Sequence, residues 1–243
     1  MENKLFDEMY KVETQHWWLV ARRKIIASII DTLKLGSDSK IMDAGCGNGD
    51  NLEFLSQYGE LTAIERDNNA LARAQSRQIG KVVQGELPDN FPSAINREND
   101  LIVLLDVLEH INDDEESLSI LKNWAKSKGK LLITVPAYQF LWTKHDELHH
   151  HKRRYTVGQL KKIIENNGWN VNYISYFNSF LFPLALIVRL KDKVFPPVKI
   201  DGLSLPNRVI NHFFEKIFSL ETFILGKFSF PFGLSIIVVA EKE

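Results

Sequence analysis

The chain has 243 residues, 44% hydrophobic and 25% charged, so it is long enough for one α/β domain with a full core and too apolar to be disordered. Thirty basic residues against 31 acidic ones give a formal net charge of -1, which disfavours a nucleic-acid partner. The single cysteine, the absence of a signal-peptide pattern and apolar runs shorter than the roughly 18 residues of a membrane span together predict a cytoplasmic protein.

Helices and short apolar strands alternate along the chain. A helix is expected in the first forty residues, because apolar side chains recur there at helical spacing up to a stop at Gly36. Strands are then expected at 40–45, 61–66, 81–86, 100–108, 129–136, 170–178 and 234–242. Helices are expected between them at 50–59, 68–78, 113–127 and 156–169, the last beginning with a capping box of Thr156 and Gln159.

This alternation predicts βαβ units, and therefore a mostly parallel, doubly wound Rossmann-like sheet with helices on both faces. Between the sixth and seventh strands, residues 178–230 are rich in Phe, Leu and Pro and are interpreted as a helical insertion. We predict one domain over 1–243, with a helical cap at about 1–36.

The stretch IMDAGCGNGD (41–50) places a glycine-rich turn after the first predicted strand. Such a turn lets the backbone approach a ligand closely. The dinucleotide fingerprint needs a third glycine where this chain has Asp50, and no Lys-Ser/Thr pair follows for a phosphate loop. A nicotinamide oxidoreductase is therefore disfavoured. Asp43 with the glycines suits a ligand that carries both an ammonium and a carboxylate.

Glu65 ends the second predicted strand, where a carboxylate can accept hydrogen bonds from two ribose hydroxyls. Together these features resemble a class I S-adenosylmethionine-dependent methyltransferase over residues 40 to about 136. The resemblance implies a seven-stranded sheet with an antiparallel last strand, and S-adenosylmethionine as the cofactor. It places Asp43, Gly45 and Gly47 at the amino-acid end of the cofactor, Glu65 at the ribose, Glu86 and Leu87 at the adenine, and Asp106 and Val107 along the cofactor. The neighbouring Cys46 and Arg66 are also expected to bind the cofactor.

Each assignment has a plainer alternative. The glycine turn could be an ordinary connection, and Glu65 could be a solvated strand end. Glu109 and His110, which follow the fourth strand, could be capping residues at a helix start.

The segment VPAYQFLWTKHDELHHHKRRYT (135–156) follows the fifth strand and should reach over the cofactor cleft. A histidine in it could act as a general base, with an arginine pair binding an acidic substrate. His145, Asp146 and a later histidine could instead bind a metal, but adjacent histidines cannot all face one point, so we predict no metal site. In a third interpretation Asp146 pairs with an arginine and Tyr155 packs at the next helix.

HWWLVARR (16–23), the segment 135–156 and FNSFLFPLALIVR (177–189) together resemble a bacterial methyltransferase subgroup linked to cell-surface polysaccharide or lipid modification. The resemblance implies His145, His151 and Tyr155 as catalytic residues and Asp146, Arg153 and Arg154 as substrate-binding residues. Arg22, in a segment that folds over the cofactor in related enzymes, could meet the cofactor carboxylate.

We therefore expect a methyltransferase that acts on oxygen of a small-molecule, glycan or lipid-linked acceptor. The alternative is a non-catalytic protein that binds the cofactor as a scaffold or sensor. The apolar 178–230 segment could form a lid, an acceptor pocket, a dimer contact, a peripheral membrane contact or a simple helical hairpin.

Overall fold

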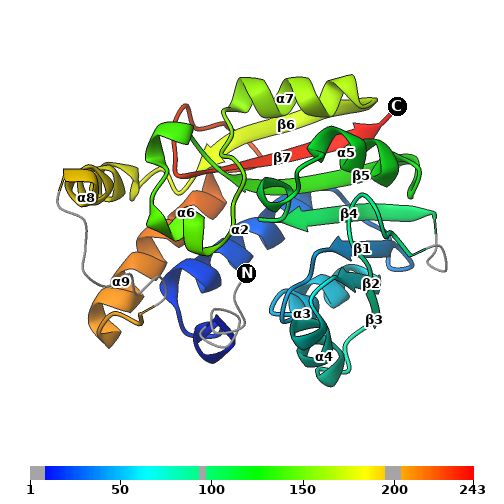
Figure 1. Cartoon of the computed structure of the whole chain (residues 1–243), viewed down its shortest axis with the longest axis horizontal. Coiled ribbons are helices and arrows are strands. Elements are labelled where there is room, and N and C mark those ends of the chain that lie inside the picture. Colours follow the sequence, from blue (N-terminus) through cyan, green and yellow to red (C-terminus); the bar gives the residue numbers. More distant parts are fainter. Residues whose placement is uncertain (1–8, 93–96, 195–203) are drawn as a thin grey trace.

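The computed structural model describes residues 9–92, 97–194 and 204–243, and in this part of the chain a seven-stranded sheet runs through the centre of the molecule (Figure 1). The strand order is β3-β2-β1-β4-β5-β7-β6, and β7 is antiparallel to both of its neighbours, as expected. The strands are β1 Lys40–Ala44, β2 Glu60–Glu65, β3 Lys81–Gln84, β4 Asn99–Leu105, β5 Ala125–Pro136, β6 Trp169–Phe177 and β7 Ser235–Lys242.

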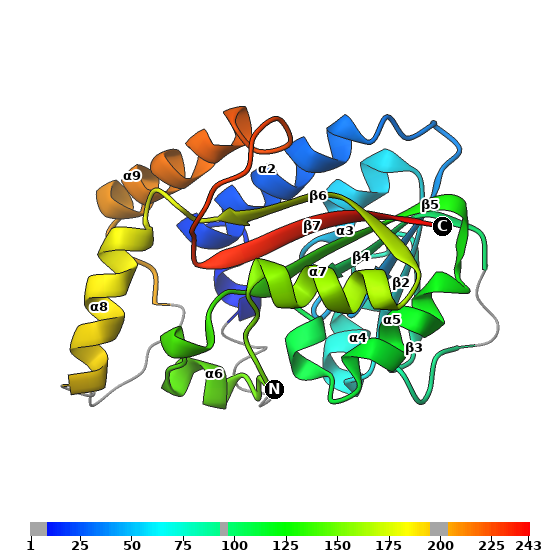
Figure 2. The same ribbon diagram turned by 90° about the horizontal axis from the view of Figure 1, so that it is seen from above.

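Helices cover both faces of the sheet, with α5 and α7 on one face and α2 and α9 on the other (Figure 2). The α-helices are α2 Trp17–Thr32, α3 Leu52–Leu55, α4 Asn68–Ser76, α5 Asp114–Lys122, α6 Lys144–Leu148, α7 Val157–Asn166, α8 Phe182–Val194 and α9 Arg208–Ser219. Short 3₁₀ turns are η1 Ser56–Tyr58, η2 Leu108–His110, η3 Gln139–Leu141 and η4 Leu220–Phe223. Parts of the predicted cap (1–8) and insertion (195–203) lie outside the described residues.

The central strands are apolar along their whole length because both faces of the sheet are covered. Successive residues point to opposite faces, so Ile41 and Leu101 pack on the α2 and α9 side while Met42 and Ile102 pack on the α5 and α7 side. All four side chains are fully buried. This continuous burial explains why the strands read as unbroken hydrophobic runs in the sequence.

The capping box predicted before α7 is present, with Thr156 and Gln159 each hydrogen-bonded to the other's backbone N–H. The helix predicted at 113–127 is wrong at its end, because α5 stops at Lys122 and β5 begins at Ala125. Both the backbone and the side-chain N–H of Asn99 donate to the carbonyl of Trp124, which ties the chain to the edge of β4. The pairing with β4 then passes through an irregularity, where Lys128 has a positive φ of 61°.

Between β6 and β7, the chain forms α8, α9 and η4. The buried Glu221 of η4 accepts backbone hydrogen bonds from Asn178, Ser179 and Phe180 at 2.6–2.9 Å, which fixes the entry to α8. Helix α9 packs along α2, where the rings of Trp17 and Phe214 are 5.5 Å apart. Among the helices of the described residues, none has the length and apolar character needed to cross a membrane.

Candidate active site

A cavity of about 950 Å³ opens at the carboxyl ends of β1, β2, β4 and β5. This is the end of a doubly wound sheet at which ligands bind, next to the point where the strand order reverses between β1 and β4. One wall is the glycine turn after β1, and the opposite wall is the histidine-rich segment after β5. The volume is at the upper end of the range for ligand pockets.

The glycine turn fits closely against the end of β4. Gly45 has a φ of 100°, and a Cβ there would lie 2.7 Å from Cγ2 of Val107, so a larger residue would be strained and crowded. The backbone N–H groups of Gly45 and Cys46 both donate to the carbonyl of Ile64 on β2. The side chain of Cys46 is buried in the core, and burial raises the pKa of its thiol. Cys46 therefore presents its backbone rather than a reactive thiolate.

Asp43 lies directly before this turn, with both carboxyl oxygens buried and without a hydrogen-bond partner. Burial, together with the nearby acidic groups of Asp50 and Glu65, raises the pKa of Asp43 to about 8. Asp43 does not itself line the cavity, whereas the next residue, Ala44, does. A buried carboxyl without a partner is costly, and a positively charged group at the turn would favour its ionised form.

Glu65 lines the cavity with only 6% of its surface exposed. One carboxylate oxygen accepts a 2.8 Å bond from the N–H of Gly47, and the other accepts bonds from the N–H groups of Arg66 and Asp67. It is therefore a positioned acceptor rather than a solvated strand end. The side chains of Arg66 and Glu86 form a half-exposed ion pair of 2.7 Å at the cavity rim, and Leu87 lines the wall beside it.

Arg22 of α2 reaches the end of β4. Its guanidinium lies 2.8 Å from the carboxylate of Asp106 and donates a hydrogen bond to Thr134, while its Nε is buried without a partner. Asp106 has a positive φ of 61° at the turn after β4. The structure thus brings Arg22, Asp106 and Val107 to the cavity, with the first two paired to each other.

The segment after β5 is organised around a buried ion pair. The carboxylate of Asp146 is bound by Arg154 at 2.8 and 3.0 Å, by Nδ1 of His151 at 2.9 Å and by the N–H of Thr143 at 2.8 Å. Although burial acts to raise it, these hydrogen bonds hold the pKa of Asp146 well below its usual range. Because its oxygens are engaged in these bonds, Asp146 is not available to join His145 in a metal site.

Arg153 and Tyr155 do not reach the cavity. Tyr155 is buried in the core and its hydroxyl donates to Asp114 at 2.8 Å. The guanidinium of Arg153 pairs with the same carboxylate and donates to the carbonyl of Asn112. For these two residues and for Asp146, the contacts are those of the structural interpretation of this segment.

The ring centroids of His145 and His149 are 4.1 Å apart at an interplanar angle of 40°, and both residues line the cavity. Burial lowers the pKa of His145 to about 4 and that of His149 to about 2, so both rings are neutral at neutral pH. The Nε2 of His149 is buried without a partner. A neutral ring can accept a proton, but a lowered pKa makes it a weak base.

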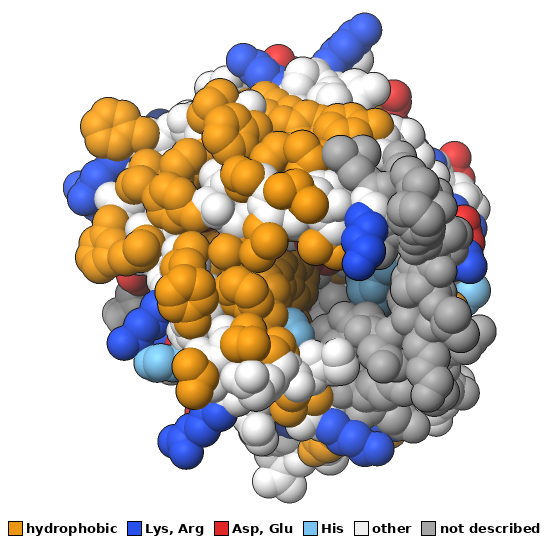
Figure 3. Space-filling view, turned by 90° about the vertical axis from the view of Figure 1, so that its left-hand side faces the viewer, with side chains coloured by type: hydrophobic (Ala, Val, Ile, Leu, Met, Phe, Trp, Pro, Cys, Tyr) orange, Lys and Arg blue, Asp and Glu red, His pale blue; other side chains and the backbone are white. Residues whose placement is uncertain are grey.

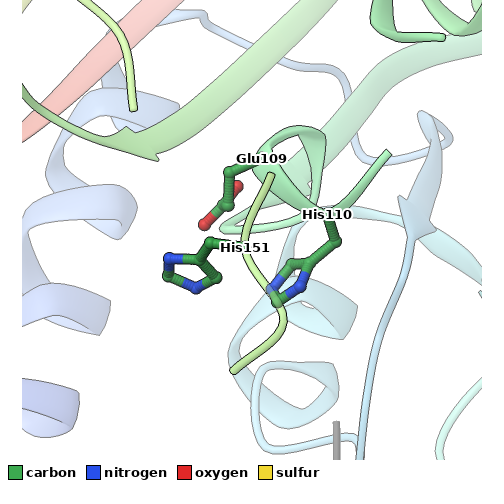
Figure 4. Close-up of side chains that lie close together, drawn as sticks. All are labelled: Glu109, His110 and His151. Carbon is green, nitrogen blue, oxygen red and sulfur yellow. The ribbon is translucent and has the colours of Figure 1, made fainter. Parts of the chain in front are cut away.

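Glu109 and His110 also line the cavity, where they meet His151 (Figure 4). From the sequence these two residues could equally have been helix caps, and the structure places both in the cavity wall. The N–H of Lys152 donates to the carbonyl of Glu109 at 2.7 Å, which joins the segments that follow β4 and β5. β4 and β5 were predicted as successive strands, and such strands lie side by side in this kind of sheet. Glu109 and His110 follow the first strand and His151 follows the second, so their positions in the sequence were the signal for this cluster.

Comparison with known proteins identifies the family to which the chain belongs. A family model described as "Methyltransferase domain" matches residues 18–174. The 235L protein of Invertebrate iridescent virus 6, whose name assigns it to the methyltransferases, is 22% identical over 156 residues, which cover 63% of this chain and 53% of the viral protein. The chain thus spans about half the length of this relative.

Two solved structures show the fold. A SAM-dependent methyltransferase from Archaeoglobus fulgidus has a TM-score of 0.62 at 19% identity, covering 96% of this chain and 99% of that one. Phosphoethanolamine N-methyltransferase 2 from Haemonchus contortus, solved in complex with S-adenosyl-L-methionine, has a TM-score of 0.57 at 15% identity, covering 88% of this chain and 51% of that one. At these identities the likeness concerns the fold.

Proposed function

From the premise that this chain belongs to the class I S-adenosylmethionine-dependent methyltransferases, we propose that it transfers a methyl group to an oxygen of a small-molecule, glycan or lipid-linked acceptor. The observation that carries the proposal is the glycine turn, with the unpartnered carboxyl of Asp43 before it and the positioned carboxylate of Glu65 beside it. All three adjoin a cavity whose opposite wall is rich in histidine.

The residues present fit the cofactor. Gly45 brings bare backbone to the cavity where it packs against Val107, and Asp43 provides a buried, unpartnered carboxyl that a bound ammonium group would favour in its ionised form. Glu65 provides carboxylate lone pairs for ribose hydroxyls, while Leu87 offers an apolar contact for the base. Arg22 already pairs with Asp106, so a cofactor carboxylate at this position would compete with that ion pair.

When bound, S-adenosylmethionine supplies an electrophilic methyl carbon on a sulfonium. The protein then has to align the acceptor, exclude water and provide a destination for the hydroxyl proton. His151 is the better placed of the two predicted bases, because Asp146 holds its Nδ1 and thereby selects the tautomer whose Nε2 is free to accept a proton. His145 is the second candidate and the weaker base, given its lowered pKa.

The surroundings of the cavity favour an apolar acceptor. Ala185 and Val188 of α8 line the cavity, while Leu184 and Ile187 on the same helix face solvent at 48% and 66% exposure. Figure 3 shows hydrophobic side chains gathered around a hollow on the face that carries α8 and α9. We define this apolar face by its exposed members Phe180, Leu184, Ile187, Val188, Val209, Ile210 and Phe213.

Arg189 and Lys191 add positive charge beside this apolar face. Apolar side chains with neighbouring basic groups suit the surface of an anionic membrane. This supports a lipid-linked acceptor of the kind used in cell-surface polysaccharide or lipid modification, reached by peripheral contact at the inner side of the membrane.

The test begins with calorimetric titration of S-adenosylhomocysteine. We expect tight binding that Glu65→Gln weakens roughly 10- to 100-fold, because hydrogen bonds to a charged acceptor are lost. Glu60→Gln, an exposed acid at the other end of β2, is the matched control and should change affinity less than twofold. Absence of binding in the wild type would refute the proposal.

Transfer is then tested with methyl-labelled S-adenosylmethionine against lipid-linked glycans, free sugars and small phenols. Labelled product from an oxygen acceptor supports the enzyme. Binding without transfer to any acceptor, with His145→Ala and His151→Ala having no biological effect, would indicate the scaffold or sensor alternative.

A further inference from the structure

Three side chains converge on one point of the acceptor wall (Figure 4). Glu109 and His110 come from η2, at the end of β4, and His151 comes from the segment after α6. One ligand atom of each, a carboxylate oxygen or a ring nitrogen, lies within 4.8 Å of the others. An ion between them needs bonds of about 2.0–2.2 Å, which small side-chain rotations from this spacing would provide.

Glu109 is the independent sign that a ligand belongs here. Its side chain is completely buried, and neither carboxyl oxygen has a hydrogen-bond partner. A buried carboxyl without a partner is expensive to maintain, whereas coordination to a cation would satisfy both the charge and the lone pairs.

His151 is already oriented as a metal ligand. Its Nδ1 is 2.9 Å from Asp146, which is itself fixed by Arg154 and by the N–H of Thr143. A carboxylate that accepts the N–H of one ring nitrogen leaves the other nitrogen as an unprotonated donor, and this arrangement is the usual second layer around histidine-bound metals. The buried ion pair of Asp146 and Arg154 therefore also orients the ring of His151.

His110 completes the set. Its ring lies 4.7 Å from that of His151, centroid to centroid, at an interplanar angle of 84°, so the two rings meet edge to face. Each of the two rings contributes one nitrogen to the cluster, and imidazole nitrogen is a common ligand of transition metals.

From this geometry we propose that Glu109, His110 and His151 bind one divalent transition-metal ion, such as Zn²⁺ or Mn²⁺, which holds the acceptor hydroxyl for methylation. Two nitrogens and one carboxylate suit such ions better than Mg²⁺ or Ca²⁺, which prefer oxygen ligands. Three protein ligands leave positions open for a substrate, and these positions face the cavity that Glu65, Asp106 and the glycine turn also line.

The role of the ion rests on the proposed methyl transfer. A hydroxyl bound to the cation loses its proton to solvent more readily, because the cation stabilises the oxygen's negative charge. An oxygen lone pair then forms the O–C bond, the C–S bond breaks, and its electron pair remains on sulfur. The products are the methyl ether, S-adenosylhomocysteine and one proton. His151 in this arrangement is a ligand rather than the general base.

The experiment uses the full chain, stripped of metal, titrated with Zn²⁺ and with Co²⁺ as a spectroscopic probe. We expect one equivalent to bind, with visible Co²⁺ absorption typical of mixed nitrogen and oxygen ligands and a rise in the unfolding temperature. Glu109→Gln and His110→Asn, two variants of similar shape, should each weaken binding at least 100-fold. His212→Ala, which removes an exposed histidine on α9, is the control for adventitious binding and should change nothing.

Absence of saturable binding in a wild-type protein that still binds S-adenosylhomocysteine would overturn the metal site and leave the proposed function standing. Unchanged metal binding in folded Glu109→Gln and His110→Asn proteins would also overturn it. Metal binding without S-adenosylhomocysteine binding would instead refute the proposed function and support the site itself. Circular dichroism of each variant confirms that the fold is retained.

Discussion

The two walls of the cavity are built in different ways. The cofactor wall is built around one continuous turn, residues 45–48, whose backbone N–H groups bond to Ile64 and Glu65 of β2. The acceptor wall is made by side chains from the ends of β4 and β5, from α6 and from α8. The shape of the cofactor wall depends on backbone conformation. The shape of the acceptor wall depends on which of its charged and aromatic side chains form ion pairs, hydrogen bonds or ring contacts.

The two walls should differ in how readily their ligand can change during evolution. A wall made of backbone tolerates few substitutions and holds a constant ligand. A wall made of side chains can be refitted to another acceptor while the ion pair of Asp146 and Arg154 keeps it in place.

The largest effect is expected from Asp146→Ala. This change leaves the guanidinium of Arg154 buried without its counter-ion, and breaking a buried pair in this way costs about 3–5 kcal/mol. Urea unfolding should show that loss. Glu165→Ala, which breaks the exposed pair with Lys161, should change stability by less than about 0.5 kcal/mol. Equally small losses of unfolding free energy in the Asp146→Ala and Glu165→Ala proteins would mean that the pair of Asp146 and Arg154 does not fix the acceptor wall.

The next effect concerns the pH dependence of cofactor affinity. Since the pKa of Asp43 is raised from 3.8 to about 8, the folded protein holds this proton more tightly than the unfolded chain. The associated stability is complete below about pH 4 and is lost as the pH rises through 8. A cationic ligand favours the carboxylate, so affinity should rise up to tenfold per pH unit between pH 6 and 8, or about 2.7 kcal/mol over that interval.

Calorimetry in buffers of different ionisation enthalpy should detect proton release on binding of S-adenosylmethionine. Asp43→Asn should flatten the pH profile and abolish that release. A profile that is equally steep in the Asn variant would assign the proton to another group.

Gly45→Ala tests the backbone wall directly. The new Cβ would sit 2.7 Å from Cγ2 of Val107 at a φ of 100°, a strain of about 2 kcal/mol. We expect loss of stability and at least tenfold weaker binding of S-adenosylhomocysteine. Gly158→Ala, in the first turn of α7, is the control, because nothing lies within 4 Å of its added Cβ and the change should not lower stability. A neutral Gly45→Ala would show that the turn adapts.

The smallest effect is expected at the apolar face. Ile187→Ser should reduce association with vesicles of anionic phospholipid about fivefold, or ~1 kcal/mol, and should leave stability within about 0.5 kcal/mol because the side chain is 66% exposed. Lys162→Ser, on the exposed side of α7, is the control for loss of a basic charge elsewhere. Equal losses in both variants would indicate general electrostatic attraction rather than insertion of α8.

Much of the fold follows from the sequence because it depends on local patterns. Strands buried on both faces must be apolar throughout, helices must be amphipathic, and the capping box of Thr156 and Gln159 is complete within four residues. The glycine turn and Glu65 are likewise set by backbone geometry at two neighbouring strand ends. The end of α5 is the exception, since it depends on Asn99, which is distant in sequence.

The acceptor wall was decided by tertiary structure. From sequence, Tyr155 and Arg153 were as eligible for the cavity as Arg154, but both of them bind Asp114, which does not line the cavity. Glu109 and His110 gain chemical meaning only where β4 and β5 bring them to His151. Burial of a side chain, and the hydrogen-bond or ion-pair partners that it finds there, change its pKa and decide whether it is available to a ligand. These depend on contacts between segments far apart in the chain, which a linear pattern does not contain.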